Sequence, residues 1–111
     1  MCGRATLAKK PKELEKRYKA KFVQSELAIK NQLPNYNIAP THWHPVLTNE
    51  KENPLRFLRW GLIPSWAKDA KIGSKLINAR SETVLEKPAL RAVHQKRCLL
   101  PYDVFYEWKR I

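Results

Sequence analysis

The first four residues, Met1-Cys2-Gly3-Arg4, place a cysteine directly behind the initiator methionine. Removal of that methionine, which is usual before a small residue, would leave Cys2 with a free α-amine beside its thiol. Both groups are partly nucleophilic near neutral pH. Such a 1,2-aminothiol condenses with an aldehyde: the amine forms an imine, and the sulfur then closes a thiazolidine ring, without metal or cofactor. The alternative is that Cys2 is a small buried apolar residue near the start of a strand.

Two further stretches carry polar residues where their neighbours predict burial. In Asn78-Ala79-Arg80, strand alternation puts the amide and the guanidinium on one face, where they could orient a nucleophile and grip a phosphate. In residues 104–108, the same alternation puts Glu107 on the face of Phe105, and a carboxylate among aromatic rings suits proton transfer near neutral pH. The alternatives are a surface turn for the first stretch and a carboxylate paired with a Lys or Arg for the second.

The charge balance indicates a polyanionic partner. The chain has 22 Lys and Arg against 10 Asp and Glu, a formal net charge of +12. Such an excess is most often associated with nucleic acid. Many of the lysines fall within residues 9–21, so a solubilising helix face is the alternative. No run of residues is long and apolar enough to cross a membrane, and no secretory signal is evident. We therefore expect no membrane partner, and a cytoplasmic, nucleoid-associated location, or a nuclear one in a eukaryote.

The elements that must position these residues follow from periodicity and from proline. Strands are expected at residues 2–7, 46–48, 55–62, 97–100 and 104–109. One helix begins at Pro11 with an apolar stripe of Leu14, Tyr18 and Phe22, and another runs from Pro88 to about Gln95. Residues 23–34 fit either a further helical turn or a loop, and Cys98 is expected in the core.

These elements predict an α+β fold: mixed or antiparallel short strands forming part of a barrel-like sheet, with two or three helices. The chain reads as one domain over residues 1–111. A strand ending near Ile111 would leave an unpaired, partly apolar edge, so the sheet is predicted to be incomplete. His42 and His44 would share a face and could bind metal with Cys2 or Cys98, but no paired-ligand spacing supports this. We expect no metal and no cofactor.

Five short motifs follow one another along nearly the whole chain. They are Met1-Cys2-Gly3-Arg4, Tyr36-Asn37-Ile38-Ala39-Pro40-Thr41, Trp60-Gly61-Leu62-Ile63-Pro64-Ser65-Trp66, Asn78-Ala79-Arg80-Ser81-Glu82-Thr83, and Arg97-Cys98-Leu99-Leu100-Pro101 with Phe105-Tyr106-Glu107-Trp108. Together they resemble the SRAP (SOS response-associated peptidase) domain family, also called abasic-site processing proteins. The resemblance favours a functional Cys2 over a buried one.

The resemblance implies a DNA-damage function: covalent capture of abasic sites in single-stranded DNA, whose ring-opened sugar is an aldehyde. Cys2 would form the thiazolidine, Asn78 would hold its α-amine, and Glu107 would act as general acid and base. The family is also assigned autocatalytic removal of Met1. The implied activity is thus that of a thiol autopeptidase and DNA–protein cross-linking protein, of the hydrolase or lyase class.

The DNA contacts are implied in the same way. Arg4 and Arg80 would bind phosphates beside the lesion, while Trp66 and Pro40 would stack or wedge against bases. Single-stranded DNA with abasic sites is therefore the expected partner.

The chain departs from the family pattern in two respects. It has Asp103-Val104 where the family usually has Asp-Gly, and it contains no H-x-R-M-P-type motif, whose histidine shares the family's active site. The chain thus resembles the N-terminal half of one SRAP-like domain, and a complementary C-terminal segment is an expected partner. Two alternatives stay open: a cysteine-type peptidase with an N-terminal nucleophile, and a non-catalytic single-stranded DNA-binding module with a steep salt dependence.

Overall fold

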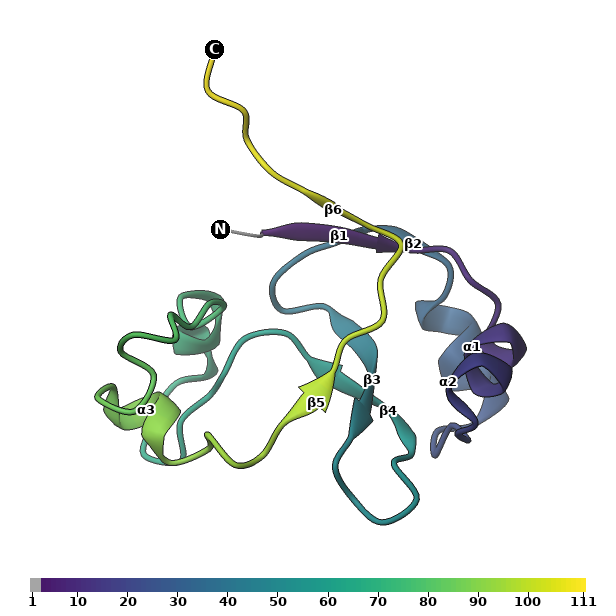
Figure 1. The fold of residues 1–111 in the computed structure, drawn as a ribbon, viewed down its shortest axis with the longest axis horizontal. Coiled ribbons are helices and arrows are strands. Elements are labelled where there is room, and N and C mark those ends of the chain that lie inside the picture. The colour runs from purple at the N-terminus through teal and green to yellow at the C-terminus, as the bar shows by residue number, and fades with distance from the viewer. Residues whose placement is uncertain (1–2) are drawn as a thin grey trace.

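Two antiparallel three-stranded sheets form the centre of the molecule. In this computed structural model, which describes residues 3–111, the first sheet has the order β2-β1-β6 and the second the order β4-β3-β5 (Figure 1). The strands are β1 (Arg4–Leu7), β2 (Asn35–Ile38), β3 (Trp43–Thr48), β4 (Leu55–Arg59), β5 (Cys98–Leu99) and β6 (Val104–Tyr106). The predicted α+β class is confirmed, and in the described residues the strands remain two open sheets and form no closed barrel.

The helices are α1 (Pro11–Tyr18), α2 (Glu26–Gln32) and α3 (Pro88–Arg91), with a 3-10 turn η1 (Ala70–Ser74). Helices α1 and α2 lie beside each other at the end of β1 away from the N-terminus, and α3 lies at the opposite side (Figure 1). Ser25 caps α2 by accepting a hydrogen bond from the Ala28 amide, 3.3 Å away, so residues 26–32 of the ambiguous 23–34 region are helical and the residues on either side are not. None of the helices in the described part of the chain is long and apolar enough to cross a membrane.

Helix α1 ends one turn earlier than the apolar stripe predicts. Lys19 adopts a left-handed conformation (φ 50°, ψ 46°), which stops the helix after Tyr18. Phe22 leaves the helix altogether: its amide donates to the Glu15 carboxylate over 3.1 Å, and it forms a bridge to Leu55 of β4. The apolar stripe therefore predicted the core residues correctly, but it predicted a helix longer than α1. The second predicted helix is also too long, since α3 ends at Arg91 and turns occupy the residues up to Gln95.

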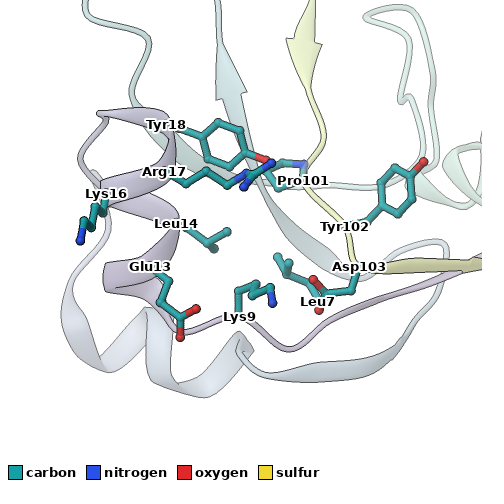
Figure 2. Close-up of a pocket in the computed structure, with 10 residues that line it drawn as sticks. All are labelled: Leu7, Lys9, Glu13, Leu14, Lys16, Arg17, Tyr18, Pro101, Tyr102 and Asp103. Carbon is teal, nitrogen blue, oxygen red and sulfur yellow. The ribbon is translucent and has the colours of Figure 1, made fainter.

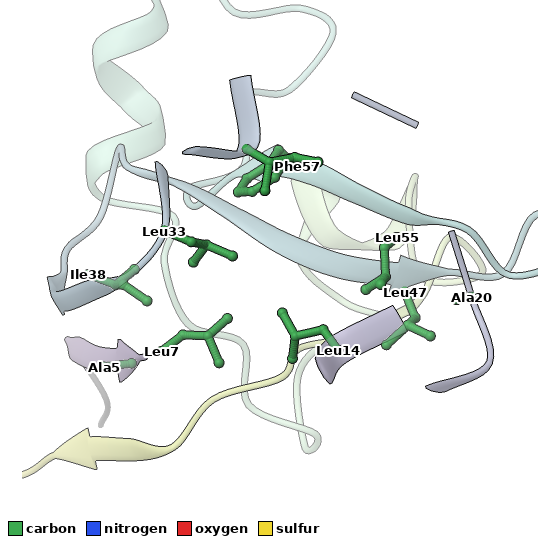
Figure 3. Close-up of a cluster of buried hydrophobic side chains, with 10 residues drawn as sticks. Ala5, Leu7, Leu14, Ala20, Leu33, Ile38, Leu47, Leu55 and Phe57 are labelled. Atoms are coloured by element: carbon green, nitrogen blue, oxygen red, sulfur yellow. The ribbon is translucent and has the colours of Figure 1, made fainter. Parts of the chain in front are cut away.

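The main core joins the first sheet, α1 and α2 to the β3–β4 hairpin. It consists of ten buried residues, most of them drawn in Figure 3: Ala5, Leu7, Leu14, Ala20, Ile29, Leu33, Ile38, Leu47, Leu55 and Phe57. Burial of each larger apolar side chain contributes about 1.5–3 kcal/mol. Because β1 contributes both Ala5 and Leu7, this core fixes the strand that begins directly after the N-terminal residues.

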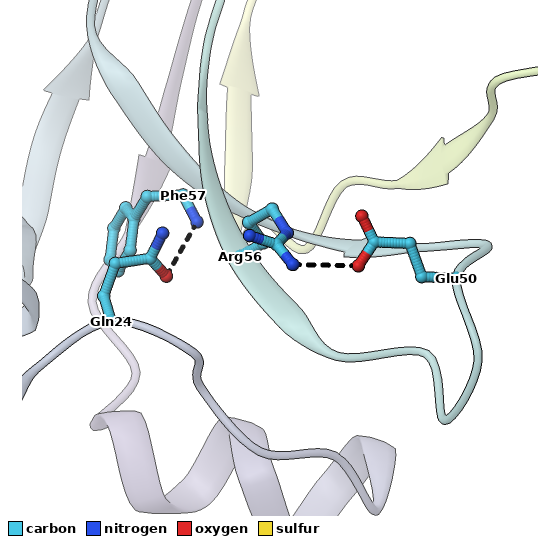
Figure 4. Close-up of polar contacts among 4 residues, drawn as sticks. All are labelled: Gln24, Glu50, Arg56 and Phe57. Carbon is cyan, nitrogen blue, oxygen red and sulfur yellow. Dashed lines mark hydrogen bonds and ion pairs between the residues drawn. The ribbon is translucent and has the colours of Figure 1, made fainter.

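Side chains satisfy the outer edge of β4. The Phe57 amide donates to the Gln24 side-chain oxygen over 3.2 Å, and Arg56 forms an ion pair of 2.9 Å with Glu50 from the hairpin loop (Figure 4). Since β4 is an edge strand, the contact at Phe57 occupies a backbone amide that would otherwise be free to pair with another strand.

A close approach of two glycines fixes the chain after β4. The predicted strand over residues 55–62 ends at Arg59, because Gly61 has a φ of 116° and turns the backbone away. A Cβ on Gly61 would collide with the Gly73 carbonyl in η1. Only glycine meets both requirements at this position.

The C-terminal strands are shorter and more exposed than predicted. Strand β5 covers Cys98 and Leu99 only, and β6 ends at Tyr106 rather than Lys109. Cys98 is exposed, so its assignment to the core is wrong. The reason is that β5 is an edge strand that pairs with β3 on one side only, so its own side chains are left uncovered.

The glycine contact gives a stability prediction. Replacing Gly61 with Ala should lower the free energy of unfolding by about 1–3 kcal/mol, because the new Cβ meets the Gly73 backbone at a strained φ. Denaturant titration followed by circular dichroism measures the change. Gly3→Ala is the control, since a Cβ there meets no atom within 4 Å. Equal stability of the two variants would contradict the prediction.

Candidate functional site

The antiparallel pairing of β1 with β6 brings the two ends of the sequence together. Arg4 lies opposite Tyr106, Ala5 opposite Phe105, and Thr6 opposite Val104. Continued by one step, this register sets Gly3 opposite Glu107. A hollow of about 540 Å³ opens at this point, lined by Gly3, Arg4, Tyr106, Glu107 and Trp108. Cys2, the predicted nucleophile, lies outside the described residues, but the residue that follows it forms part of this wall.

Arg4 is held here by a neutral partner. Its Nη1 donates to the Asn37 side-chain oxygen of β2 over 3.0 Å, and the backbone N–H of Asn37 donates to the Asn35 side-chain oxygen over 2.9 Å. An amide orients the guanidinium without neutralising it, and most of its N–H donors remain for other groups. The side chain is exposed at the hollow. Its geometry is therefore suited to binding an anion such as phosphate.

Hydrogen bonds of Trp60 connect its own motif to the motif that ends at Thr41 and to the residue before the motif that begins at Asn78. The Trp60 carbonyl accepts from the Thr41 amide over 2.8 Å, and its indole Nε1 donates to the Ile77 carbonyl over 3.1 Å. The Leu62 amide also donates to the Leu76 carbonyl over 3.0 Å. The turn after β2 and the segment before Asn78 are thus both fixed to the chain that follows β4.

The Asn78 to Arg80 segment is not a strand, contrary to the pattern from which its shared face was inferred. Both side chains are exposed, and neither makes a hydrogen bond within the part of the chain that the structure describes. Trp66 is 62% exposed on the loop after Pro64, and Pro40 is half-buried in the turn between β2 and β3. None of these four residues lines the hollow with Glu107, so their roles stay predictions.

Glu107 does not share its surroundings with Phe105. Phe105 lines a second cavity, of about 400 Å³, between the two sheets, whereas Glu107 lines the hollow at the N-terminus. The two separate because β6 ends at Tyr106, so strand alternation no longer governs Glu107. Glu107 has an interaction partner in this fold.

Sequence patterns gave no role to His44, which lines the cavity between the sheets. It is 1% exposed, and its Nε2 lies 2.6 Å from the Pro101 carbonyl. Because a carbonyl only accepts, Nε2 carries the proton, and the buried Nδ1 is left without a partner in the described residues. Burial lowers the pKa of His44, an effect partly offset by the hydrogen bond to Pro101.

Among the described residues, His42 and His44 are not brought together with other metal-binding side chains. The His42 Nδ1 accepts from the Ala39 amide over 3.2 Å, while His44 is engaged with Pro101. In residues 3–111, no group of three His, Cys, Asp or Glu side chains is arranged to hold a metal ion.

Sequence patterns also gave no separate role to Asn37 and Trp60. Both belong to motifs that were recognised only as family signatures. Asn37 orients Arg4, and Trp60 fixes the backbone before Asn78. The motifs contain both residues, but the partners of Asn37 and Trp60 lie too far away in the sequence for periodicity to reveal them.

The fold is one already seen in a solved structure. The crystal structure of a protein from Bacteroides thetaiotaomicron superposes on it with a TM-score of 0.77 at 24% identity, over 99% of this chain and 50% of that one. The family model described as SOS response associated peptidase (SRAP) matches residues 1–111, and the chain belongs to that family.

Similar proteins extend well beyond the matched region. The abasic site processing protein YoqW of Bacillus subtilis (strain 168) is 45% identical over 113 residues, covering 100% of this chain and 49% of YoqW. YoaM of the same organism is 56% identical over 80 residues, covering 70% of this chain and 35% of YoaM. The abasic site processing protein HMCES of Gallus gallus is 37% identical over 91 residues, covering 69% of this chain and 27% of HMCES. The chain thus spans about half the length of YoqW.

The buried histidine predicts how stability depends on pH. The unfolded chain binds a proton at His44 near the ordinary pKa of 6.5, whereas the folded chain resists protonation. Stability should therefore fall as the pH drops through about 6.5, and it should level off above that pH.

Denaturant titrations between pH 5 and 8 measure this dependence. His44→Gln should flatten the slope between these pH values, while His94→Gln should keep it, because His94 lies outside the cavity. Equal slopes in the two variants would exclude His44 as the cause.

Proposed function

We propose that this protein captures abasic sites in single-stranded DNA covalently through Cys2, after autocatalytic removal of Met1. The observation that carries the proposal is the β1–β6 register, which brings Gly3, Arg4 and Glu107 to one hollow. The names of the similar proteins YoqW and HMCES support an abasic-site substrate.

The chemistry needs no cofactor. Hydrolysis of the Met1–Cys2 bond consumes one water and frees the Cys2 amine. That amine adds to the C1′ aldehyde of the ring-opened sugar and loses water to give an imine. The thiol sulfur then attacks the imine carbon while its proton passes to the nitrogen, which closes the thiazolidine. In sum, aldehyde and aminothiol become thiazolidine and one water.

Glu107 is the proposed proton carrier in these steps. It lines the same hollow as Gly3, so a carboxylate faces the residue bonded to Cys2. It would protonate the departing hydroxyl during imine formation and take a proton during Met1 removal. Asn78 would orient the α-amine.

The remaining residues would hold the strand. Arg4 has a neutral partner in Asn37, which supports a role in binding a phosphate beside the lesion. Arg80 would bind a second phosphate. The exposed indole of Trp66 would stack on a base, worth about 1–3 kcal/mol, with Pro40 as a wedge beside it.

The first functional prediction concerns the adduct. Incubation with a single-stranded oligonucleotide carrying one abasic site should give a product that survives denaturing electrophoresis. Cys2→Ala should abolish it, and Glu107→Gln should slow its formation by about 10²-fold or more, as loss of a general acid–base group does. Cys98→Ser is the matched control, because Cys98 is the exposed second thiol.

Other outcomes would favour the other functions. No adduct, together with equal affinity for intact and abasic strands, would leave a non-catalytic DNA-binding module. Cys2-dependent cleavage of peptides in trans would instead favour a cysteine peptidase. An adduct that persists in Cys2→Ala would place the nucleophile elsewhere.

We also propose that a complementary C-terminal segment, like the half of YoqW that this chain does not match, packs on the C-terminal strands. Both β5 and β6 are edge strands. Residues 99–111 expose large hydrophobic side chains: Leu99, Leu100, Tyr102, Val104, Phe105, Tyr106, Trp108 and Ile111. So many large hydrophobic side chains exposed in one segment are typical of a protein-interaction surface.

The proposal predicts binding in trans. The half of YoqW outside the matched region, mixed with this chain, should form a one-to-one complex detectable by size-exclusion chromatography with light scattering. Leu99→Asp should weaken the complex at least about tenfold, because it sets a charge where a leucine would be buried. Leu27→Asp on α2 is the control, since Leu27 is 69% and Leu99 is 68% exposed. Equal binding by both variants, or no complex, would refute the proposal.

A further inference from the structure

A larger cleft lies at the other end of the β1–β6 pair. It measures about 890 Å³ and opens between α1 and the turn Pro101–Asp103 (Figure 2). The residues that line it are Leu7, Lys9, Glu13, Leu14, Lys16, Arg17, Tyr18, Pro101, Tyr102 and Asp103. The same two strands thus carry the candidate site at one end and this cleft at the other.

The cleft is lined by three cations, Lys9, Lys16 and Arg17, and by two carboxylates, Glu13 and Asp103. Residues 9–21 contain seven Lys or Arg and two Glu. The carboxylate of Glu15 accepts from the Phe22 amide, and that of Asp103 accepts from the Ala8 amide over 2.7 Å. The Arg56–Glu50 ion pair lies elsewhere, on the β3–β4 hairpin, and involves no residue of the cleft. The positive charge of this segment therefore remains available to an outside anion.

Aromatic rings stand beside these cations. Tyr18 and Tyr102 both line the cleft, and the Arg17 guanidinium carbon lies 6.0 Å from the centre of the Tyr18 ring. The ring of Tyr102 is steadied by an edge contact with Phe105, with centroids 5.7 Å apart. A basic groove with aromatic side chains is the arrangement that binds single-stranded nucleic acid without sequence preference. A merely solubilising helix face needs neither a cleft nor rings.

We propose that this cleft is a second contact for single-stranded DNA, holding the backbone on one side of the reacting nucleotide. Its cations Lys9, Lys16 and Arg17 bind phosphates, and a base lies against the ring of Tyr18. Its place beside a lesion rests on the function proposed above. The strand β1 rises about 3.3 Å per residue, so Arg4 and Leu7 are roughly 10 Å apart. One extended strand of DNA reaches both ends of β1.

Two triple variants with the same net charge test the cleft. The first is Lys9→Gln, Lys16→Gln, Arg17→Gln, and the second is Lys51→Gln, Lys87→Gln, Lys96→Gln. Each lowers the formal charge from +12 to +9, and the second set is exposed and lies outside the cleft. Circular dichroism and thermal melting verify that both fold.

The measurement is fluorescence anisotropy with an intact labelled single strand of about 16 nucleotides, at the upper end of common site sizes, over a series of salt concentrations. Each phosphate contact contributes about 0.7 to the slope of log K against log salt for single strands. The cleft variant should lose about 2 from that slope, and the control variant should match the wild type. Equal slopes in the two variants would overturn the proposal.

A second readout separates this inference from the proposed function. At saturating concentrations of an abasic strand, the cleft variant should form the adduct at the wild-type rate, because the cleft binds and does not react. A slower rate at saturation would place these cations in the reaction instead and would contradict a pure binding role. If the wild type forms no adduct but the salt slopes of the two variants differ, the DNA contact at the cleft is supported and the proposed function is refuted. If the adduct forms and the two salt slopes agree, only the DNA contact at the cleft is refuted.

Discussion

The pairing of β1 with β6 is the constraint on which the rest of the structure depends. It joins segments about a hundred residues apart and sets the register that brings Gly3 and Glu107 to one hollow. The turn before β6 reinforces it: the Asp103 amide donates to the Thr6 carbonyl, and its carboxylate accepts from the Ala8 amide. At the start of the same turn, His44 of β3 is hydrogen-bonded to the carbonyl of Pro101. One short turn thus links β1 to β3, and both sheets depend on it.

Several of the motif residues support the backbone of other motifs. The Trp60 carbonyl accepts a hydrogen bond from the Thr41 amide, and its indole N–H donates to the Ile77 carbonyl. Gly61, which has no Cβ, allows the backbone to lie against Gly73. The exposed residues to which function was assigned, such as Asn78, follow directly after these fixed points. A rigid backbone of this kind holds side chains on loops in a defined place, as binding and catalytic residues require.

The sequence predicted local features well and burial at the C-terminal strands poorly. Pro11 marked the start of α1, and the Leu14 stripe marked a core face, because both depend on a few neighbouring residues. The end of α1 was missed because the Glu15 carboxylate captures the Phe22 amide outside the helix. Cys98 was assigned to the core because its apolar neighbours say nothing of which strand covers it. The buried His44 depends on Pro101, which no spacing rule connects to it.

The long separation between β1 and β6 has a consequence for synthesis of the protein. During translation the chain grows at roughly 5–20 residues per second, so about 5–20 seconds pass between the synthesis of Arg4 and that of Tyr106. In that interval β1 can pair with β2, which comes early in the chain, but the wall containing Glu107 does not yet exist. The N-terminal residues therefore meet Glu107 only after the rest of the first sheet has been made. Cys2 is thus synthesised several seconds before the segment that contains Glu107.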